Sequence, residues 1–174
     1  MVKLFNDTFN INEIIGSNST EVLLENEFTI AEGKPAIEKI VTVEGKAKIS
    51  NVAVTTDSVI VDGKLIYNII YRSNNEDYNI YSITDEIPFR EEIEAEGATE
   101  DMEAFSNAFI DYLDAEQLSE VSYLVKSVLV LDTDVSMKRP VTYVSSLESD
   151  SSIQAKTKNI TYTDTVAELS GSQP

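Results

Sequence analysis

The densest group of residues able to do chemistry is an acidic run between Asp85 and Glu103. It holds nine carboxylates and a single basic residue, Arg90. Two carboxylates at a suitable separation can act as the general acid and base of a hydrolase. Nothing in the run selects one pair over another, and a charged run of this kind is usually a solvated face of a protein. We therefore predict no catalytic residues and no enzyme activity.

Metal and cofactor chemistry is restricted by the residue types that are missing. The chain has neither cysteine nor histidine, so it lacks the usual zinc ligands and the Ser/His and Cys/His relays of nucleophilic catalysis. The acidic run does not show the spacing of a twelve-residue calcium loop with its central glycine. We predict no cofactor and no metal site. A calcium site and a Lys–Asn or Lys–Asp isopeptide crosslink remain open, because both use residue types that the chain contains.

The net charge excludes two classes of partner. Over 174 residues the chain carries 31 acidic and 13 basic side chains, for a formal charge of −18. Such a surface repels nucleic-acid phosphates and anionic lipids, so we predict neither nucleic acid nor membrane as a partner. The first ten residues lack a signal-peptide pattern, and no stretch has the length and hydropathy of a membrane span. The sequence predicts synthesis in the cytoplasm without a signal peptide.

One long central β-strand is predicted from Val59 to Arg72. Its odd-numbered residues are almost all apolar, and its even-numbered residues mix isoleucine with charge, which is the period of a strand with two different faces. Asp62-Gly63 would suit a hairpin turn, but the alternation passes through it in register. Gly63 is therefore predicted to be a bulge or a close backbone approach. The half-apolar even face indicates cover by a second layer or a partner.

The stretch around residues 34–41 is predicted to be one short helix. Pro35 suits the first helical position, and Ile37, Ile40 and Val41 have the i, i+3, i+4 spacing of a helical face. Residues 104–114 fit either a helix or a strand, and a strand is favoured because an unmistakable strand follows. Pro88 places its segment at a sheet edge. A phase shift at Asn51 predicts a bulge.

These elements predict a mainly β fold, an antiparallel β-sandwich or barrel-like single domain. The domain is expected to span residues 1–145, followed by a polar, serine-rich linker at residues 146–158. Residues 160–173 repeat the pattern of residues 9–20, a short strand, an acidic residue, an apolar pair and a Ser/Gly turn, which in the first copy lies at residues 16–19. Residues 159–174 are therefore predicted to be a C-terminal strand resembling the start of a further repeat.

This similarity between the two ends predicts a self-assembly interface. The strand near the C-terminus of one copy would add to the next copy, in a place equivalent to that of its own opening strand. The alternative is that residues 160–169 complete the sheet of their own domain. The predicted interface residues are Phe9, Ile11, Ile14, Ile15, Ile160, Tyr162, Val166 and Leu169.

Three short motifs occur along the chain: Glu32 to Val41, Tyr67 to Tyr71, and Ile87 to Phe89 followed by Gly97-Ala98. Together they resemble the SPOCS domain, a β-rich module of clostridial spore-envelope proteins. The resemblance covers about residues 9 to 135 and implies a β-rich domain without known catalytic residues. In the family such domains often occur in tandem, sometimes with a peptidoglycan-binding LysM module, in proteins that bring coat material to the forming spore. This chain has Ala36 where the family has Asp, and no LysM-like tail.

The resemblance and the two similar ends lead to one functional expectation and one alternative. We expect a non-enzymatic structural protein of the bacterial spore surface (coat, exosporium or appendage) that self-assembles, head-to-tail by β-strand addition, into filaments or rings. Its partners are then copies of itself, with other spore-coat proteins as further partners. The alternative is a monomeric adaptor that docks to another spore-coat assembly protein.

Overall fold

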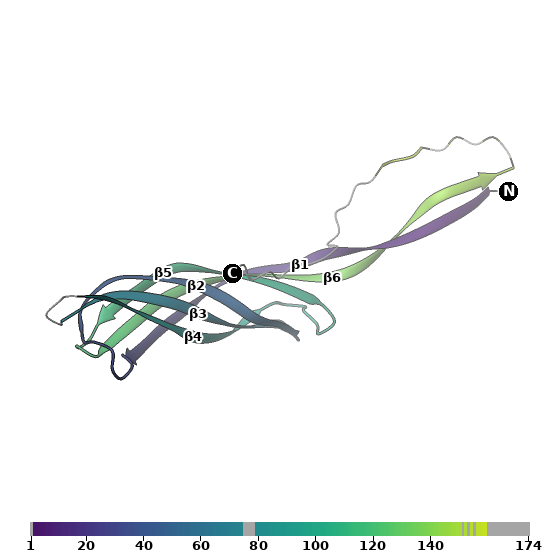
Figure 1. The fold of residues 1–174 in the computed structure, drawn as a ribbon. Helices are drawn as coiled ribbons and strands as arrows, with labels where there is room; N and C mark the ends of the chain where they lie inside the picture. The colour runs from purple at the N-terminus through teal and green to yellow at the C-terminus, as the bar shows by residue number, and fades with distance from the viewer. Residues whose placement is uncertain (1, 75–78, 151, 153, 155, 160–174) are drawn as a thin grey trace. The chain divides into compact units, whose positions relative to one another are not determined.

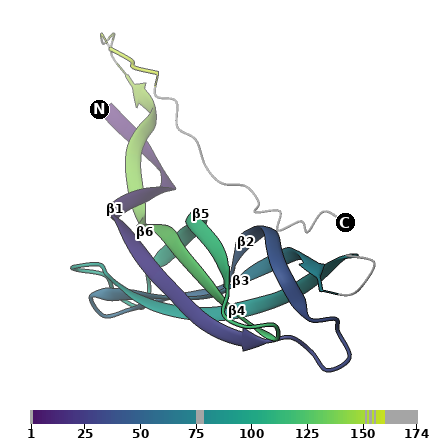
Figure 2. The same ribbon diagram turned by 90° about the vertical axis from the view of Figure 1, so that its left-hand side faces the viewer.

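The computed structural model describes residues 2–74, 79–150, 152, 154 and 156–159. These residues form six β-strands and no helix. The strands are β1 (Val2–Thr29), β2 (Ile37–Thr55), β3 (Ser58–Ser73), β4 (Ile80–Glu94), β5 (Glu103–Gln117) and β6 (Ser122–Ser149). They pair into two three-stranded antiparallel sheets with the orders β1-β6-β5 and β2-β3-β4 (Figures 1 and 2). The prediction of a mainly β, antiparallel fold is confirmed.

The chain divides into two compact units. The first, here the ribbon unit, consists of residues 1–13 and 137–174, and the second, here the sheet unit, consists of residues 14–136. Strands β1 and β6 contribute residues to both units. The sheet unit holds all of β2, β3, β4 and β5, and its two sheets pack around one hydrophobic core. This layered arrangement fits the predicted sandwich.

The predicted central strand is β3, which lies between β2 and β4 in its sheet. Its odd-numbered side chains Val59, Val61, Leu65 and Ile69 are fully buried, while the even-numbered ones from Ile60 to Arg72 are only partly covered. Strand β4, which carries Pro88, is at the edge of the sheet order, so the edge position predicted from the proline is confirmed.

Gly63 is a close backbone approach inside β3. It pairs with Ile49 on one side and with Phe89 on the other, and the pairing of β3 with β4 passes through it without a shift. A Cβ at this position would lie 2.3 Å from Phe89 Cζ and 2.7 Å from the carbonyl oxygen of Lys48. The bulge belongs instead to β2, whose register shifts between Ile49 and Asn51. This confirms the bulge predicted at Asn51.

The predicted short helix near residues 34–41 is wrong, because β2 begins at Ile37 and no helix precedes it. The pairing of β2 with β3 shifts between Ile37 and Lys39 and again between Ile40 and Thr42. Each shift inserts an extra residue on β2, so Ile37 and Ile40 both lie opposite odd-numbered residues of β3. Bulges in a strand therefore produced the i, i+3 spacing that we read as helical.

The turn predicted at residues 16–19 is also wrong, since β1 runs without interruption from Val2 to Thr29. The small polar residues of this segment bond across the sheet to acids of β6. Ser17 Oγ donates to Asp134 Oδ1 over 2.5 Å, and Ser19 Oγ donates to Asp132 Oδ1 over 2.7 Å. Residue types that are typical of a turn here serve as cross-strand hydrogen-bond donors.

Strand β5 settles the ambiguity at residues 104–114, which are confirmed as strand. Its pairing with β6 shifts between Ile110 and Tyr112. Because of this shift, Phe109 and Tyr112 lie opposite Val130 and Val128, two residues of the same face of β6. Two aromatic side chains three residues apart thus lie on one face of the strand.

Three aromatic side chains join the two sheets at the centre of the core. Tyr67 of β3 and Tyr123 of β6 are each 1 % exposed, and their hydroxyl oxygens lie 3.3 Å apart. The ring of Phe28 lies 5.8 Å from that of Tyr67 and 5.6 Å from that of Tyr123, measured between centroids. Buried hydroxyl groups need a hydrogen-bond partner, and here each phenol is the partner of the other.

This tyrosine pair should make the protein sensitive to alkali. Burial raises the pKa of both phenols above the usual 10.0, and the charge of Asp85 raises both further. Above about pH 10 the unfolded chain releases these protons while the folded chain keeps them, so stability should fall with rising pH by up to ~1.4 kcal/mol per pH unit for each tyrosine. Urea denaturation of the wild type at increasing pH should show this slope. A chain carrying Tyr67→Phe and Tyr123→Phe should lose most of it, and equal slopes would contradict the assignment.

Candidate assembly surfaces

The acidic run that dominates the sequence lies along β4 and the loop that follows it. Glu86 forms an ion pair with Lys64, and Glu92 accepts a hydrogen bond of 2.7 Å from Ser58 Oγ. The side chains of Asp85, Glu86 and Glu92 are at least partly exposed. In the described part of the chain, no three acidic side chains are grouped so that they could hold a metal ion.

The loop after β4 is held by Asp57, a residue that sequence reasoning did not single out. Asp57 has a positive φ of 60° in the tight turn between β2 and β3. Its backbone N–H donates to Ala98 O over 3.0 Å, its carbonyl accepts from Ala95 N over 2.9 Å, and its Oδ1 accepts from Gly97 N over 2.8 Å. Aspartate tolerates this conformation better than most residues. In the sequence, the residue pair Thr56-Asp57 was the sign of a tight turn at this place.

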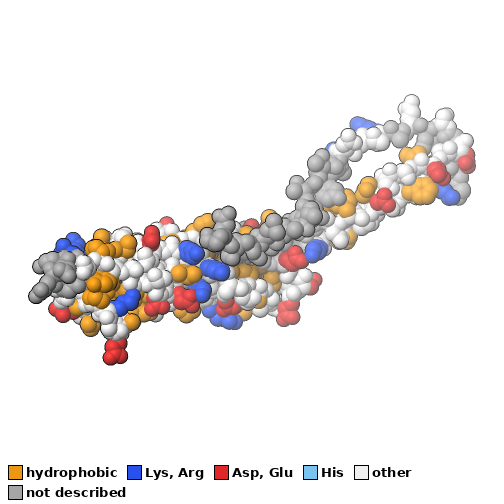
Figure 3. All heavy atoms as spheres, viewed as in Figure 1, with side chains coloured by type: hydrophobic (Ala, Val, Ile, Leu, Met, Phe, Trp, Pro, Cys, Tyr) orange, Lys and Arg blue, Asp and Glu red, His pale blue; other side chains and the backbone are white. Residues whose placement is uncertain are grey.

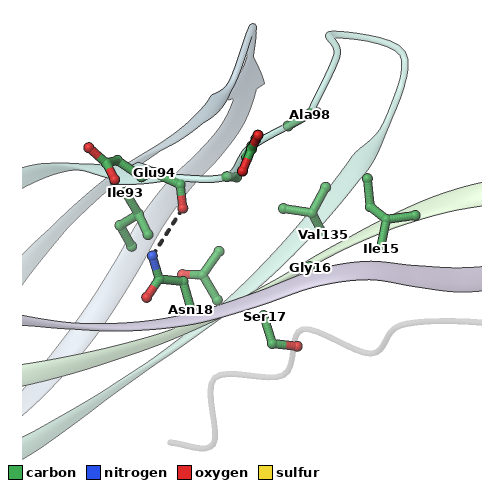
Figure 4. A pocket seen from close by; sticks show the side chains of 11 residues that line it. Ile15, Gly16, Ser17, Asn18, Ile93, Glu94, Ala98 and Val135 are labelled. Carbon is green, nitrogen blue, oxygen red and sulfur yellow. Dashed lines mark hydrogen bonds between the residues drawn. The ribbon is translucent and has the colours of Figure 1, made fainter.

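A pocket of about 260 Å³ opens where β1 passes the end of β4 within the sheet unit. Ile15, Ile93 and Val135 give it an apolar floor, and Asn18 Nδ2 donates across it to the carbonyl of Glu94 over 3.0 Å (Figure 4). Ser17 points away from this hydrogen bond in the same view. The pocket lies along a seam between two strand edges that belong to different sheets.

The ribbon unit contains two antiparallel strand segments, residues 2–13 of β1 and 137–149 of β6. Figure 1 shows them twisted about each other. Thr8 Oγ1 and Thr142 Oγ1 lie 2.9 Å apart, and Arg139 Nη1 lies 3.0 Å from Glu13 Oε2. No third strand covers these segments among the described residues, because β5 pairs with β6 only as far as Ser136. An isolated two-stranded ribbon is marginally stable in water.

Large apolar side chains of the ribbon unit are exposed, and orange atoms reach the surface along it in Figure 3. Several of them lie on each strand: Val2, Leu4, Phe5, Met137, Tyr143, Val144 and Leu147. Exposed apolar groups beside unpaired strand edges are typical of a surface that receives another chain.

The predicted interface residues fall into three groups. Phe9 and Ile11 lie on the ribbon, where the ring of Phe9 meets that of Tyr143 edge-on, with centroids 5.6 Å apart at 65°. Ile14 and Ile15 lie in the sheet unit; both are exposed, and Ile15 lines the pocket. The other four, Ile160, Tyr162, Val166 and Leu169, lie outside the described residues. Strand β6 ends at Ser149, inside the stretch for which a linker is predicted.

A comparison with protein-family models matches residues 36–118 to the model described as SipL, SPOCS domain. This match supports the assignment of residues 36–118 to the SPOCS domain family. Residues 36–118, here the SPOCS segment, contain the whole of β2, β3, β4 and β5. Searches of curated proteins and of solved structures found no match. A match to the SPOCS domain points to a sporulation-related protein.

The motifs that carry the resemblance are packing positions of the SPOCS segment. Ile87 and Phe89 are buried side chains of β4, and Ala98 is buried in the following loop. Tyr71 OH donates to Pro35 O over 3.1 Å, which ties the end of β3 to the residue just before the segment. The family motifs therefore supply part of the core of the sheet unit, which is completed by residues of β1 and β6.

In the described part of the chain, no helix has the length and hydropathy needed to cross a membrane.

Proposed function

We propose that this protein is a non-enzymatic structural protein of the spore surface that assembles with itself by β-strand addition. Residues 160–169 of one copy add to an edge of the ribbon unit of the next copy. The observation that carries the proposal is the two-stranded ribbon, with its unpaired edges and exposed apolar side chains. A third strand would bond to backbone groups left open at an edge and cover part of the apolar surface.

The two edges of the ribbon are not equivalent. Pro140 lies on β6 and has no N–H to donate, so a ladder along that edge would lose a bond. Residues 2–13 of β1 contain no proline, and their edge offers every backbone donor on its open side. We therefore place the added strand on β1. Because the added strand and its acceptor are different surfaces, the contact repeats from copy to copy and yields a ring or a filament.

The decisive experiment compares the full chain with a chain lacking residues 158–174. The full chain should form filaments or rings in negative-stain electron microscopy, while the truncated chain should give single particles with an unchanged thermal unfolding curve. A chain in which residues 158–174 are scrambled keeps the composition and should also stay single. Unfolding of the truncated chain would show that these residues complete their own sheet, and assembly of the truncated chain would contradict strand addition.

The alternative function is a monomeric adaptor that docks to another spore-coat assembly protein. The exposed acids along β4 and the loop after it favour a basic partner. Single small particles of the full chain at every salt and calcium concentration would favour this alternative.

A further inference from the structure

Within the sheet unit, the side of the β1-β6-β5 sheet that faces away from the core carries exposed aromatic residues. Phe105 and Phe109 are each 54 % exposed, and Tyr112 is 49 % exposed. All three lie opposite even-numbered residues of β6, whereas the buried side chains of β6 are the odd-numbered ones. Large apolar groups that gather on the open side of a sheet are typical of a surface that receives a partner.

Strand β1 extends the same surface. Ser17 and Ser19 donate hydrogen bonds to Asp134 and Asp132, which are exposed, even-numbered residues of β6. Further along β1, Leu23 lies on this side and is 77 % exposed, while its neighbours on the other side of the strand pack in the core. We call this outward side the acidic face. Its apolar centre consists of Leu23, Phe105, Phe109, Tyr112, Val128 and Val130.

The acidic face carries almost no positive charge. Lys126 is the only basic residue that β1, β5 and β6 contribute to the sheet unit, against nine acidic residues. Its Nζ lies 3.1 Å from Glu116 and 3.9 Å from Glu25, so its charge is already shared between two carboxylates. The carboxylates of Asp132 and Asp134 accept hydrogen bonds from neutral serines, which leave their charge uncompensated. The face therefore keeps a large excess of negative charge.

The acids lie at both ends of the apolar centre. Asp132 and Asp134 lie at one end, and at the other end Asp114 lies opposite Lys126. The distance from Asp132 to Lys126 is six residues along β6, roughly 20 Å in a strand. A partner that reaches both acidic ends therefore needs cationic groups at about that separation, with apolar side chains between them.

We propose that the acidic face docks a segment of another protein in which basic residues flank an apolar stretch. Lysine and arginine would pair with the acids at both ends, and arginine can also stack on the exposed aromatic rings. A small cation would leave the apolar centre exposed to water. Nucleic acid and anionic lipid would be repelled by the acids.

A second copy of this chain fits the acidic face less well than a basic partner. On the outward side of the β2-β3-β4 sheet, six basic residues are matched by six acidic ones, so that side has no positive excess to offer. The acidic face of a second copy would add like charge. This docking surface lies wholly within the sheet unit, and the ribbon assigned to strand addition takes no part in it.

The test measures binding of two synthetic peptides to the full chain by fluorescence anisotropy in low salt. The matched peptide is capped and labelled Lys-Arg-Thr-Ile-Thr-Val-Thr-Arg-Lys. When it is extended, its two arginines lie six residues apart, on the same side as its apolar residues. The control peptide, Lys-Arg-Arg-Lys-Thr-Ile-Thr-Val-Thr, has the same composition with its bases at one end. The matched peptide should bind roughly tenfold more tightly, because only it reaches both acidic ends, and added salt should weaken it.

Two full-length variants test the two parts of the surface. Asp132→Asn with Asp134→Asn removes the charge at one end and keeps side-chain oxygens that accept from the serines of β1. It should weaken binding of the matched peptide by roughly tenfold. Phe109→Thr with Tyr112→Thr removes aromatic groups from the apolar centre and should weaken binding by at least about as much. A thermal unfolding curve shows that each variant is folded.

The matched control for the charge change is Glu96→Gln with Glu100→Gln, in the exposed loop after β4. It alters the net charge by the same amount and should change binding by less than about twofold. The comparison of the two peptides uses the wild-type chain, so it decides the proposal even where a variant fails to fold.

Equal binding of the two peptides would overturn the proposal, because it would show attraction to the net charge of −18 alone. An effect of Asp132→Asn with Asp134→Asn no larger than that of the control pair would also overturn it, as would full binding without Phe109 and Tyr112. Self-association of the full chain that is lost in the Phe109→Thr, Tyr112→Thr variant would identify a second copy as the occupant instead. None of these measurements involves the ribbon, so their failure would leave strand addition untouched.

Discussion

Gly63→Ala should lower the free energy of unfolding by about 3 kcal/mol, the upper end of the usual cost of overpacking a core. The added Cβ would lie 2.3 Å from Phe89 Cζ and 2.7 Å from Lys48 O. The phenylalanine ring is itself buried and the carbonyl belongs to the β2 backbone. Neither can withdraw without moving a neighbouring strand. Urea denaturation followed by circular dichroism measures the change.

The matched control for Gly63→Ala is Gly16→Ala. Gly16 also lies within a strand, does not adopt a positive φ, and has no atom within 4 Å of the position that an added Cβ would take. Its substitution should shift the unfolding midpoint little. A Gly63→Ala midpoint equal to that of Gly16→Ala would show that β2 and β4 can separate at this point without cost.

Leu129→Ala should be similarly damaging, by about 2–5 kcal/mol, because it removes a fully buried side chain and leaves a cavity. Leu129 lies on β6, the middle strand of its sheet, and is 0 % exposed. The same denaturation experiment measures the loss.

Leu23→Ala provides the comparison for this loss, since Leu23 is a leucine of the same sheet that is 77 % exposed. It should cost less than about 0.5 kcal/mol. Equal losses for the two leucines would mean that the core does not lie where β6 packs on β3.

The parts of the fold that could be predicted are the strands in which apolar and polar residues alternate without interruption. The alternation from Val59 to Arg72 has no shift, so the strand, its buried face and the close approach at Gly63 could all be predicted. Strand β2 has three register shifts, and each one moves apolar residues out of phase. A bulge is defined by how a strand pairs with its neighbour, which a single sequence does not give. The three-residue spacing of Ile37 and Ile40 therefore could not distinguish a bulged strand from a helix.

The surfaces were harder to predict than the core. Phe109 and Tyr112 share a face only because of the shift between Ile110 and Tyr112, so no simple alternation would have grouped them. Lys46 and Lys48 of β2 lie opposite Ile66 and Lys64 of β3, and the sequence alone does not give that pairing. Ser17 and Asn18 looked like turn residues, although they bond across strands and across the seam. Their partners are more than 70 residues away in the chain.

Strands β1 and β6 each pass without a break from the ribbon unit into the sheet unit, and this continuity has a mechanical consequence. Each strand is 28 residues long, a contour of roughly 90 Å. The hydrogen bonds between antiparallel strands lie perpendicular to the strand axes. A force pulling along one of these strands therefore loads many bonds in shear at once instead of opening them one after another.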